Sequence, residues 1–262
     1  MLQNHDINHQ ITADFHALLM TPNLVTYGDY SISDQWLQQF SKNAIIPTHV
    51  SYHGNARLGF YYQWLWQQLI IHHPDYSLIG EEIQLQWQHQ TVGAIDFLVH
   101  NHNSDEIEHW EVAIKFYLSF QHQWPGPNAN DNLDKKINRM RDHQLQLTTH
   151  PAFEPLDYSL PTQHRLIMQG RLFDAWPETQ SGSSMIINPT SLKGHWCYCS
   201  QASAALTLRV LEKRQWIAPP SFSQLTTTLD TTNIMVPTQA VDNNDTVWFI
   251  VPNHWPRHNR EQ

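Results

Sequence analysis

Cysteine is nearly absent from the chain, which contains only Cys197 and Cys199. Two cysteines cannot build a disulfide framework, so we expect a protein of a reducing compartment. Long apolar runs are missing too, because no segment approaches the roughly eighteen apolar residues that a membrane span requires. The first ten residues are polar and lack the basic end and apolar run of a signal peptide. These absences favour a cytoplasmic protein that is not inserted in a membrane.

Positive charge is also scarce. The chain has 15 Lys and Arg against 24 Asp and Glu, a net charge of −9 with its 18 His neutral. This balance argues against a general, charge-driven nucleic-acid binder, but it does not exclude a nuclease whose site recruits cations. The 262 residues are 40% hydrophobic and include 11 Trp, which is typical of a globular protein with a large core.

The apolar periodicity predicts an ordered series of helices and strands. Helical spacing appears in residues 8–20, in a short segment after the capping residue Ser33, and in residues 57–73 and 131–147. Strand patterns cover residues 78–88, 91–99, 109–117 and 164–170, followed by 196–200 and 246–252, with a helix expected over 201–212. We therefore expect an N-terminal helical extension over 1–56, an α/β core over 57–170, and an α+β C-terminal elaboration over 171–262, packed on the core.

Two carboxylates are expected to face each other on the hairpin formed by residues 91–99 and 109–117. A turn centred between Asn103 and Ser104 places Asp96 opposite Glu111. Directly opposite residues have Cβ atoms about 5 Å apart, where like charges repel, and a divalent cation such as Mg²⁺ would relieve that repulsion. Lys115 shares the face and would stabilise charge on a phosphate or help activate water. The alternative is an exposed Glu111–Lys115 ion pair with Asp96 in a turn.

This pattern resembles the PD-(D/E)XK nuclease superfamily over residues 57–170. Asp96 stands in G-A-I-D-F, and Glu111 and Lys115 stand in W-E-V-A-I-K. The resemblance implies a restriction-endonuclease-like core of helix, three strands, helix and strand. It also implies Mg²⁺ or Mn²⁺ held by Asp96 and Glu111, and phosphodiester cleavage with Lys115 as the third catalytic residue. The chain departs from the usual E-x-K spacing, because Ala113 stands at the acid position, and the first helix offers Gln63 rather than an acid.

Over its whole length the chain resembles an uncharacterised bacterial family, domain of unknown function 1853. The resemblance is carried by R-L-G-F-Y-Y-Q-W-L-W (57–66), W-P-G-P-N-A-N-D-N-L-D-K-K (124–136) and V-P-N-H-W-P (251–256). It implies that the C-terminal part belongs to the same unit, and it carries over no activity.

Further residues suggest nucleic-acid contacts. Lys136, Arg139 and His143 follow at spacings of three and four, so they share one helix face that could track phosphates or simply be solvated. Trp124 in a loop could stack on a base near the mouth of a cleft. His195, Cys197 and Cys199 alternate, but two buried cysteines are a better interpretation than a zinc site.

Three functions follow from these patterns. The first is a Mg²⁺-dependent nuclease or DNA-processing factor. The second is a catalytically inactive nuclease-like protein that binds nucleic acid or a protein partner. The third is a small-molecule or nucleotide-binding protein that reuses the fold, because fold alone does not determine function.

Overall fold

The computed structural model describes residues 2–177, 186–202 and 206–256 and divides the chain into two compact units. Unit 1 contains residues 1–114 and 137–169, and unit 2 contains residues 115–136 and 170–262. Strands β3 (Glu106–Leu118) and β4 (Gln163–Ala175) run from one unit into the other. The division into 1–56, 57–170 and 171–262 stays a prediction.

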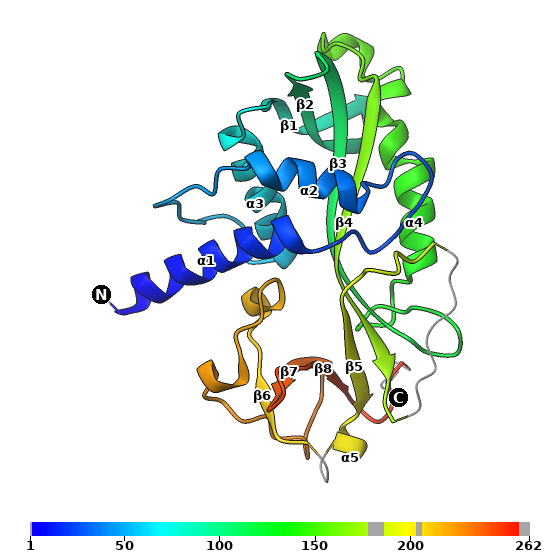
Figure 1. Cartoon of the computed structure of the whole chain (residues 1–262). Coiled ribbons are helices and arrows are strands. Elements are labelled where there is room, and N and C mark those ends of the chain that lie inside the picture. Colours follow the sequence, from blue (N-terminus) through cyan, green and yellow to red (C-terminus); the bar gives the residue numbers. More distant parts are fainter. Residues whose placement is uncertain (1, 178–185, 203–205, 257–262) are drawn as a thin grey trace. The chain divides into compact units, whose positions relative to one another are not determined.

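Unit 1 is built on an antiparallel hairpin series. The strands β1 (Tyr76–Trp87), β2 (Gln90–Asn101) and β3 pair in that order, and β4 lies next to β3. Helices α1 (Leu2–Met20), α2 (Asp34–Asn43) and α3 (Leu58–His72) lie to one side of β3 and β4, and α4 (Leu133–Asp142) lies to the other (Figure 1). The predicted order of helix, three strands, helix and strand is present in these elements.

Local sequence accounts for the limits of α2 and α3. The Ser33 hydroxyl accepts the N–H of Trp36 at 3.1 Å, as predicted for a capping residue, and this satisfies one of the free donors of the first turn. Helix α3 ends at His72, just before Pro74, which cannot continue a helix. Its buried side chains are Tyr61, Tyr62, Leu65, Trp66, Leu69 and Ile70.

An aromatic core joins α2 and α3 to the sheet. The fully buried Trp110 of β3 meets Trp36, Trp66 and Tyr76 edge-on, with ring centroids 5.3, 6.2 and 5.4 Å apart. Such edge-to-face pairs add to the free energy gained by burying the rings. Trp110 therefore points from β3 toward α3. Because side chains alternate along a strand, its neighbours His109 and Glu111 point to the opposite face of the sheet.

Unit 2 contains strands that pair in both parallel and antiparallel directions. Strand β4 pairs in parallel with β5 (Lys193–Tyr198), and β5 pairs in parallel with β8 (Val247–Val251). Strands β7 (Thr238–Asp242) and β6 (Leu208–Val210) follow in antiparallel order. The strand order is β1-β2-β3-β4-β5-β8-β7-β6, so the chain is a mixed α/β protein with a large sheet.

Gly170 allows β4 to pass close to β3 within unit 2. Its φ of +137° is a conformation that L side chains rarely adopt, and a Cβ there would collide with the backbone of Lys115. Only glycine permits this approach.

Two predicted helices differ from the structure. The helix expected over 131–147 begins at Leu133 and ends at Asp142, and the 3-10 helix η1 (Gln144–Thr149) replaces its last turn. The helix expected over 201–212 is wrong, because residues 208–210 form β6 and pair with β7; residues 203–205 lie outside the described residues. The short elements α5 (Cys199–Ala202), η2 (Glu154–Leu156), η3 (Lys213–Trp216) and η4 (Phe222–Gln224) complete the series. None of the helices in the described ranges has the length and apolar character of a membrane span.

Candidate functional site

Asp96 and Glu111 lie next to the end of the regular pairing of β2 with β3, where side chains hydrogen-bond to the backbone of the neighbouring strand. The register runs from Asn101 opposite Glu106 to Phe97 opposite Trp110. This is the predicted register, and its next step places Asp96 opposite Glu111. There the Val112 N–H donates to Asp96 Oδ2 at 2.9 Å, and the Asp96 N–H donates to Glu111 Oε1 at 3.4 Å. Each carboxylate therefore reaches across to the backbone of the other strand.

The inward and outward alternation of β2 breaks at the same position. Ile95 and Leu98 belong to one buried cluster with Leu147 of η1, although residues three apart in a regular strand point to opposite faces. Regular alternation would place Ile95 on the face of Phe97 and Val99, so the strand is irregular between Ile95 and Leu98. A local irregularity of this kind redirects a side chain, and such irregularities are common beside functional sites.

Strand β1 is irregular at the same level of the sheet. Glu81 pairs with Phe97 and Ile83 pairs with Ile95, so Glu82 lies at the level of Asp96. Glu82 has a φ of +46°, the left-handed region. Both strands are thus irregular at the level of Asp96.

Glu111 is completely buried and held by two neutral donors. Gln144 of η1 donates to Oε2 at 2.9 Å, and His109 Nε2 lies 2.9 Å from Oε1. Burial lowers the pKa of His109 to about 3, so its ring is neutral and donates through Nε2 to the carboxylate. These donors orient Glu111 and carry no charge themselves.

A second histidine extends this arrangement. The ring of His164 lies 5.4 Å from that of His109, and its Nε2 lies 3.1 Å from the Thr148 hydroxyl. Burial, with a smaller contribution from His109, lowers the pKa of His164 to about 4. Within the described part of the chain, Nδ1 of His109 is buried and finds no hydrogen-bond partner. His109, His164 and Gln144 were not predicted from the sequence. Only the alternation of His109 with Glu111 along β3 could have indicated one of them.

Lys115 belongs to unit 2 and contacts an acid that the sequence analysis placed elsewhere. Its Nζ lies 3.1 Å from Asp131 Oδ2, with the two side chains 29% and 41% exposed. The Tyr117 hydroxyl donates to the same oxygen at 3.2 Å. Asp131 was expected in the first turn of a helix, but it precedes α4 because Asn132 and Leu133 start that helix later. Lys115 and Tyr117 alternate on β3, yet only the folding of the loop over 119–132 brings Asp131 to them.

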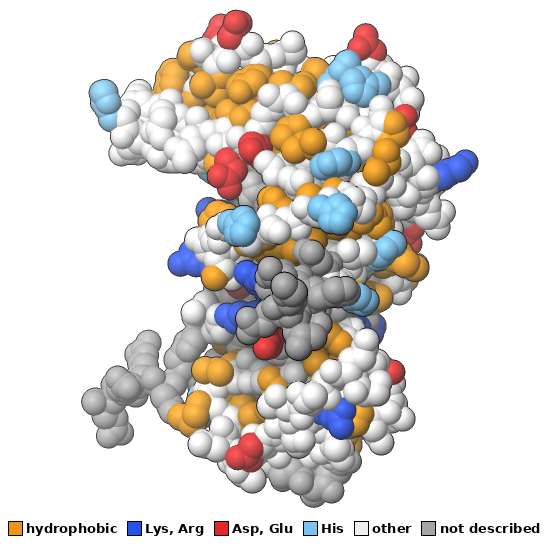
Figure 2. Space-filling model, turned by 90° about the vertical axis from the view of Figure 1, so that its left-hand side faces the viewer, with side chains coloured by type: hydrophobic (Ala, Val, Ile, Leu, Met, Phe, Trp, Pro, Cys, Tyr) orange, Lys and Arg blue, Asp and Glu red, His pale blue; other side chains and the backbone are white. Residues whose placement is uncertain are grey.

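The predicted phosphate-contacting residues are partly accessible. Arg139 and His143 are exposed and Lys136 is half-buried. His143 lies just beyond the end of α4 and directly precedes Gln144, which contacts Glu111. Of the three predicted phosphate-contacting residues, His143 is therefore next in sequence to a residue that contacts the carboxylate pair. Figure 2 shows one face of the molecule, on which Lys, Arg, Asp and Glu cover little of the surface and several histidines are exposed.

Trp124 does not lie at the mouth of a cleft as expected. It is fully buried, and Lys193 Nζ lies 4.8 Å from its ring centroid. The ring packs in unit 2 because the loop folds back, with backbone hydrogen bonds joining Leu118 to Pro125 and Leu133 to Trp124. A buried ring offers no stacking surface to a base.

The two cysteines are buried free thiols, as expected. Burial raises the pKa of Cys197 to about 12, which makes the thiol a weak metal ligand and a poor nucleophile. Across residues 2–177, 186–202 and 206–256, no three His, Cys, Asp or Glu side chains form a group that could hold a metal ion by themselves. Asp96 and Glu111 are two carboxylates, which is the usual protein contribution to a Mg²⁺ site completed by water and phosphate oxygens.

Comparison with known proteins identifies a family. The family model described as "Domain of unknown function (DUF1853)" matches residues 5–260. No curated protein and no solved structure matches the chain. Because the match covers nearly the whole chain, the chain belongs to the DUF1853 family.

Proposed function

We propose that the chain is a divalent-metal-dependent phosphodiester hydrolase acting on nucleic acid, with a restriction-endonuclease-like core in which Asp96 and Glu111 hold the metal. The observation that carries the proposal is the crossed contact of the two acids. The carboxylate of Asp96 accepts the N–H of Val112, while Glu111 accepts the N–H of Asp96. Two charged carboxylates at the same level of neighbouring strands repel each other, and a cation between them would offset the repulsion.

The surroundings of the acids fit a hard cation. Glu111 is oriented by Gln144 and His109, and Asp96 by the Val112 N–H, and these three donors are neutral. Second hydrogen bonds of this kind fix the direction of metal-binding carboxylates. Bound there, Mg²⁺ or Mn²⁺ would lower the pKa of a bound water and stabilise negative charge on phosphorus. Asp96 is half-buried and Glu111 buried, so the pair meets solvent on the Asp96 side.

Lys115 supplies the positive side chain of the proposed site. It follows Glu111 by four residues on β3 and would balance charge on a substrate phosphate. Its ion pair with Asp131 is partly exposed, and pairs of that kind contribute only about 0–1 kcal/mol. Exchange of Asp131 for a phosphate therefore costs little. Arg139 and His143 are proposed to contact the substrate backbone.

One observation favours a second candidate, an inactive nuclease-like protein that binds nucleic acid or a protein partner. Both oxygens of Glu111 already accept hydrogen bonds and its side chain is fully buried. In such a protein these contacts serve folding alone, and the carboxylates bind no cation.

Measurements of nucleic-acid cleavage and of metal binding distinguish the active hydrolase from the inactive nuclease-like protein. Labelled single-stranded, duplex and branched DNA and RNA are incubated with the protein in Mg²⁺ or Mn²⁺, and with EDTA as the blank. We expect metal-dependent cleavage that Asp96→Ala abolishes and that Asp29→Ala, at an exposed acid between α1 and α2, leaves unchanged. Mn²⁺ binding without cleavage of any substrate would favour a metal-binding protein of another function. Neither binding nor cleavage would reject the proposal and favour the inactive protein.

A further inference from the structure

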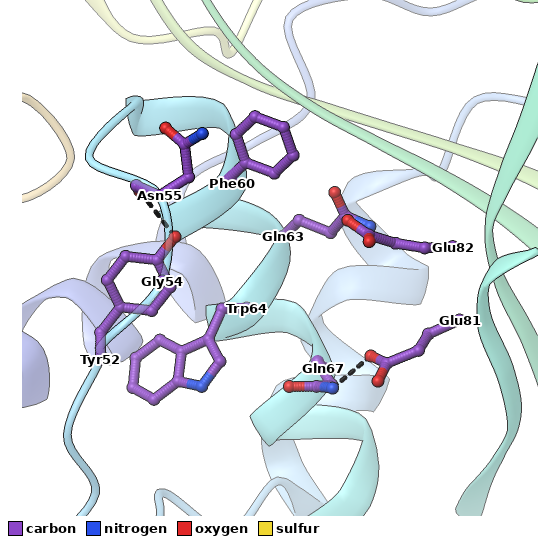
Figure 3. Close-up of a pocket in the computed structure, with 9 residues that line it drawn as sticks. All are labelled: Tyr52, Gly54, Asn55, Phe60, Gln63, Trp64, Gln67, Glu81 and Glu82. Carbon is purple, nitrogen blue, oxygen red and sulfur yellow. Dashed lines mark hydrogen bonds between the residues drawn. The ribbon is translucent and has the colours of Figure 1, made fainter.

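A second candidate site lies between α3 and β1 in unit 1, lined by none of the residues of the carboxylate pair. It is a pocket of about 400 Å³ with three kinds of wall: aromatic rings, side-chain amides and two carboxylates. Figure 3 shows the lining residues, which are Tyr52, Gly54, Asn55, Phe60, Gln63, Trp64, Gln67, Glu81 and Glu82. Among these described residues there is no Lys, Arg or His, so the lining carries negative charge with no counterion of its own.

The backbone of β1 is distorted so that both acids line the pocket. Glu81 and Glu82 are consecutive, and in a regular strand their side chains would point to opposite faces. The φ of +46° at Glu82 removes that alternation, and both residues contribute to the lining. The left-handed region is unfavourable for a residue other than glycine, and two neighbouring like charges add to that strain. Strain of this kind gathers at binding sites, where a ligand relieves it.

The acids are also oriented. The Gln67 side-chain amide donates a hydrogen bond to Glu81 Oε2, and its Oε1 accepts from Gln68 Nε2 at 3.1 Å. This chain of amides directs Glu81 without supplying a positive charge. Gln63 comes from the preceding turn of α3 and lies on the same side of the pocket as Glu82 (Figure 3).

The aromatic wall is held by a folded loop. The Tyr52 hydroxyl donates to the carbonyl of Asn55 at 2.7 Å, closing the loop over Gly54, where a Cβ would lie 2.7 Å from Tyr52 Cζ. Trp64 packs against Tyr52 and Tyr61, with centroids 5.2 and 5.8 Å apart, and Phe60 is 42% exposed. The faces of aromatic rings attract cations, most strongly for Trp.

We propose that this pocket binds a guanidinium cation, as found in an arginine side chain or in a small guanidine such as agmatine. The two carboxylates would accept its N–H donors as a planar fork, and an aromatic ring would stack on its flat face. A phosphate or nucleotide would be repelled by the same two charges. A compact ammonium would pair with the acids but would lack the stacking. The site is independent of the proposed hydrolase, because its binding needs neither metal nor nucleic acid.

The first test uses the unaltered full chain in EDTA and two ligands of the same shape. By titration calorimetry we expect N-acetyl-argininamide to bind and its neutral isostere, N-acetyl-citrullinamide, to bind at least about tenfold more weakly, because the charge-assisted bonds are lost. Raising the salt from about 50 to about 500 mM should weaken the arginine ligand, because the acids are exposed and screened. No binding, equal binding of the citrulline ligand, or equal binding of N-acetyl-lysinamide would overturn the proposal.

The second test locates the binding. Glu82→Gln keeps the size of the side chain and removes its charge, and we expect it to weaken N-acetyl-argininamide binding about tenfold or more. Glu154→Gln, at an exposed acid that begins η2, is the matched control and should leave binding unchanged. Equal binding to the Glu82→Gln protein and the unaltered protein would overturn the assignment to this pocket. Titration of a glycine-flanked arginine peptide and of agmatine then identifies the source of the guanidinium group. Tighter binding of the peptide indicates a protein partner, and tighter binding of agmatine indicates a free guanidine.

Discussion

The backbone N–H of Asp96 donates to the side chain of Glu111 across two neighbouring strands, at 3.4 Å. In return, the carboxylate of Asp96 accepts the N–H of Val112, the residue that follows Glu111. These hydrogen bonds tie each acid to the backbone of the neighbouring strand, so the two acids contribute to the structure as well as to the proposed metal site.

Asp96→Asn should separate folding from metal binding. The asparagine carbonyl can still accept the Val112 N–H, so we expect the free energy of unfolding in urea to change by less than about 1 kcal/mol. Loss of one of two carboxylates should weaken Mn²⁺ binding by at least about tenfold, measured by calorimetry. Asp29→Asn is the control, at an exposed residue of the loop between α1 and α2. Unchanged Mn²⁺ affinity in the Asp96→Asn protein would contradict the proposed metal ligands.

Gln144→Glu places a third carboxylate beside the buried Glu111. The donor at 2.9 Å becomes an acceptor, so without metal we expect a loss of about 1–3 kcal/mol of stability. Mg²⁺ should restore part of that loss, because three acids bind it more tightly than two. Thermal unfolding with and without Mg²⁺ measures both effects. Gln146→Glu, at the neighbouring amide of η1, should show no such recovery. A loss that Mg²⁺ does not reverse would argue that the pair is structural only.

Arg165→Met should destabilise the protein by about 3–5 kcal/mol, because it leaves Glu108 buried without its cation. Arg165 donates through Nε and Nη2 to the two oxygens of Glu108, whose side chain is fully buried. The double variant Glu108→Gln/Arg165→Met should recover part of the loss, because it removes the buried charge and Gln keeps one oxygen for either Asn101 or Trp110, which donate to different oxygens of Glu108. Urea unfolding of the three proteins measures the coupling. A single variant as stable as the unaltered protein would show that this pair adds nothing.

The same pair predicts a pH dependence. Burial alone would raise the pKa of Glu108, but the Arg165 guanidinium outweighs it and lowers the pKa below its usual value. The folded state therefore binds this proton less readily than the unfolded state. The contribution of Glu108 is fully present above its unfolded pKa of about 4.5 and is lost as the pH falls through the folded pKa. Unfolding measured between neutral and acidic pH should show this loss, and the double variant should show less of it.

Gly170→Ala should destabilise unit 2 severely, by more than about 2 kcal/mol, because the new Cβ meets the Lys115 backbone and the φ of +137° is strained. Gly59→Ala is the matched control. It lies in α3, where nothing stands within 4 Å of the added methyl group, and it should stabilise the helix by up to about 1 kcal/mol. Urea or thermal unfolding compares the two. A tolerated Gly170→Ala substitution would contradict the close approach of β3 and β4 at this residue.

Local pattern determined the elements and the hairpin register of this protein. Helical and strand periods placed α2, α3, β1, β2, β3 and β8, and the polar turn around Asn103 set Asp96 opposite Glu111, because a short turn leaves one register for the strands that it joins. The buried cysteines also followed from composition.

Only the tertiary structure decided which side chains surround the carboxylates. Ile95 turned to the side of Leu147, Gln144 reached Glu111, and Asp131 came to Lys115, each through contacts between segments distant in the chain. Periodicity describes one segment at a time, so it cannot anticipate an interruption that a neighbouring segment stabilises. Trp124 was misplaced for the same reason, since its loop position suggested exposure while long-range packing buried it. The residues that carry charge were visible in the sequence, but their partners depended on the fold.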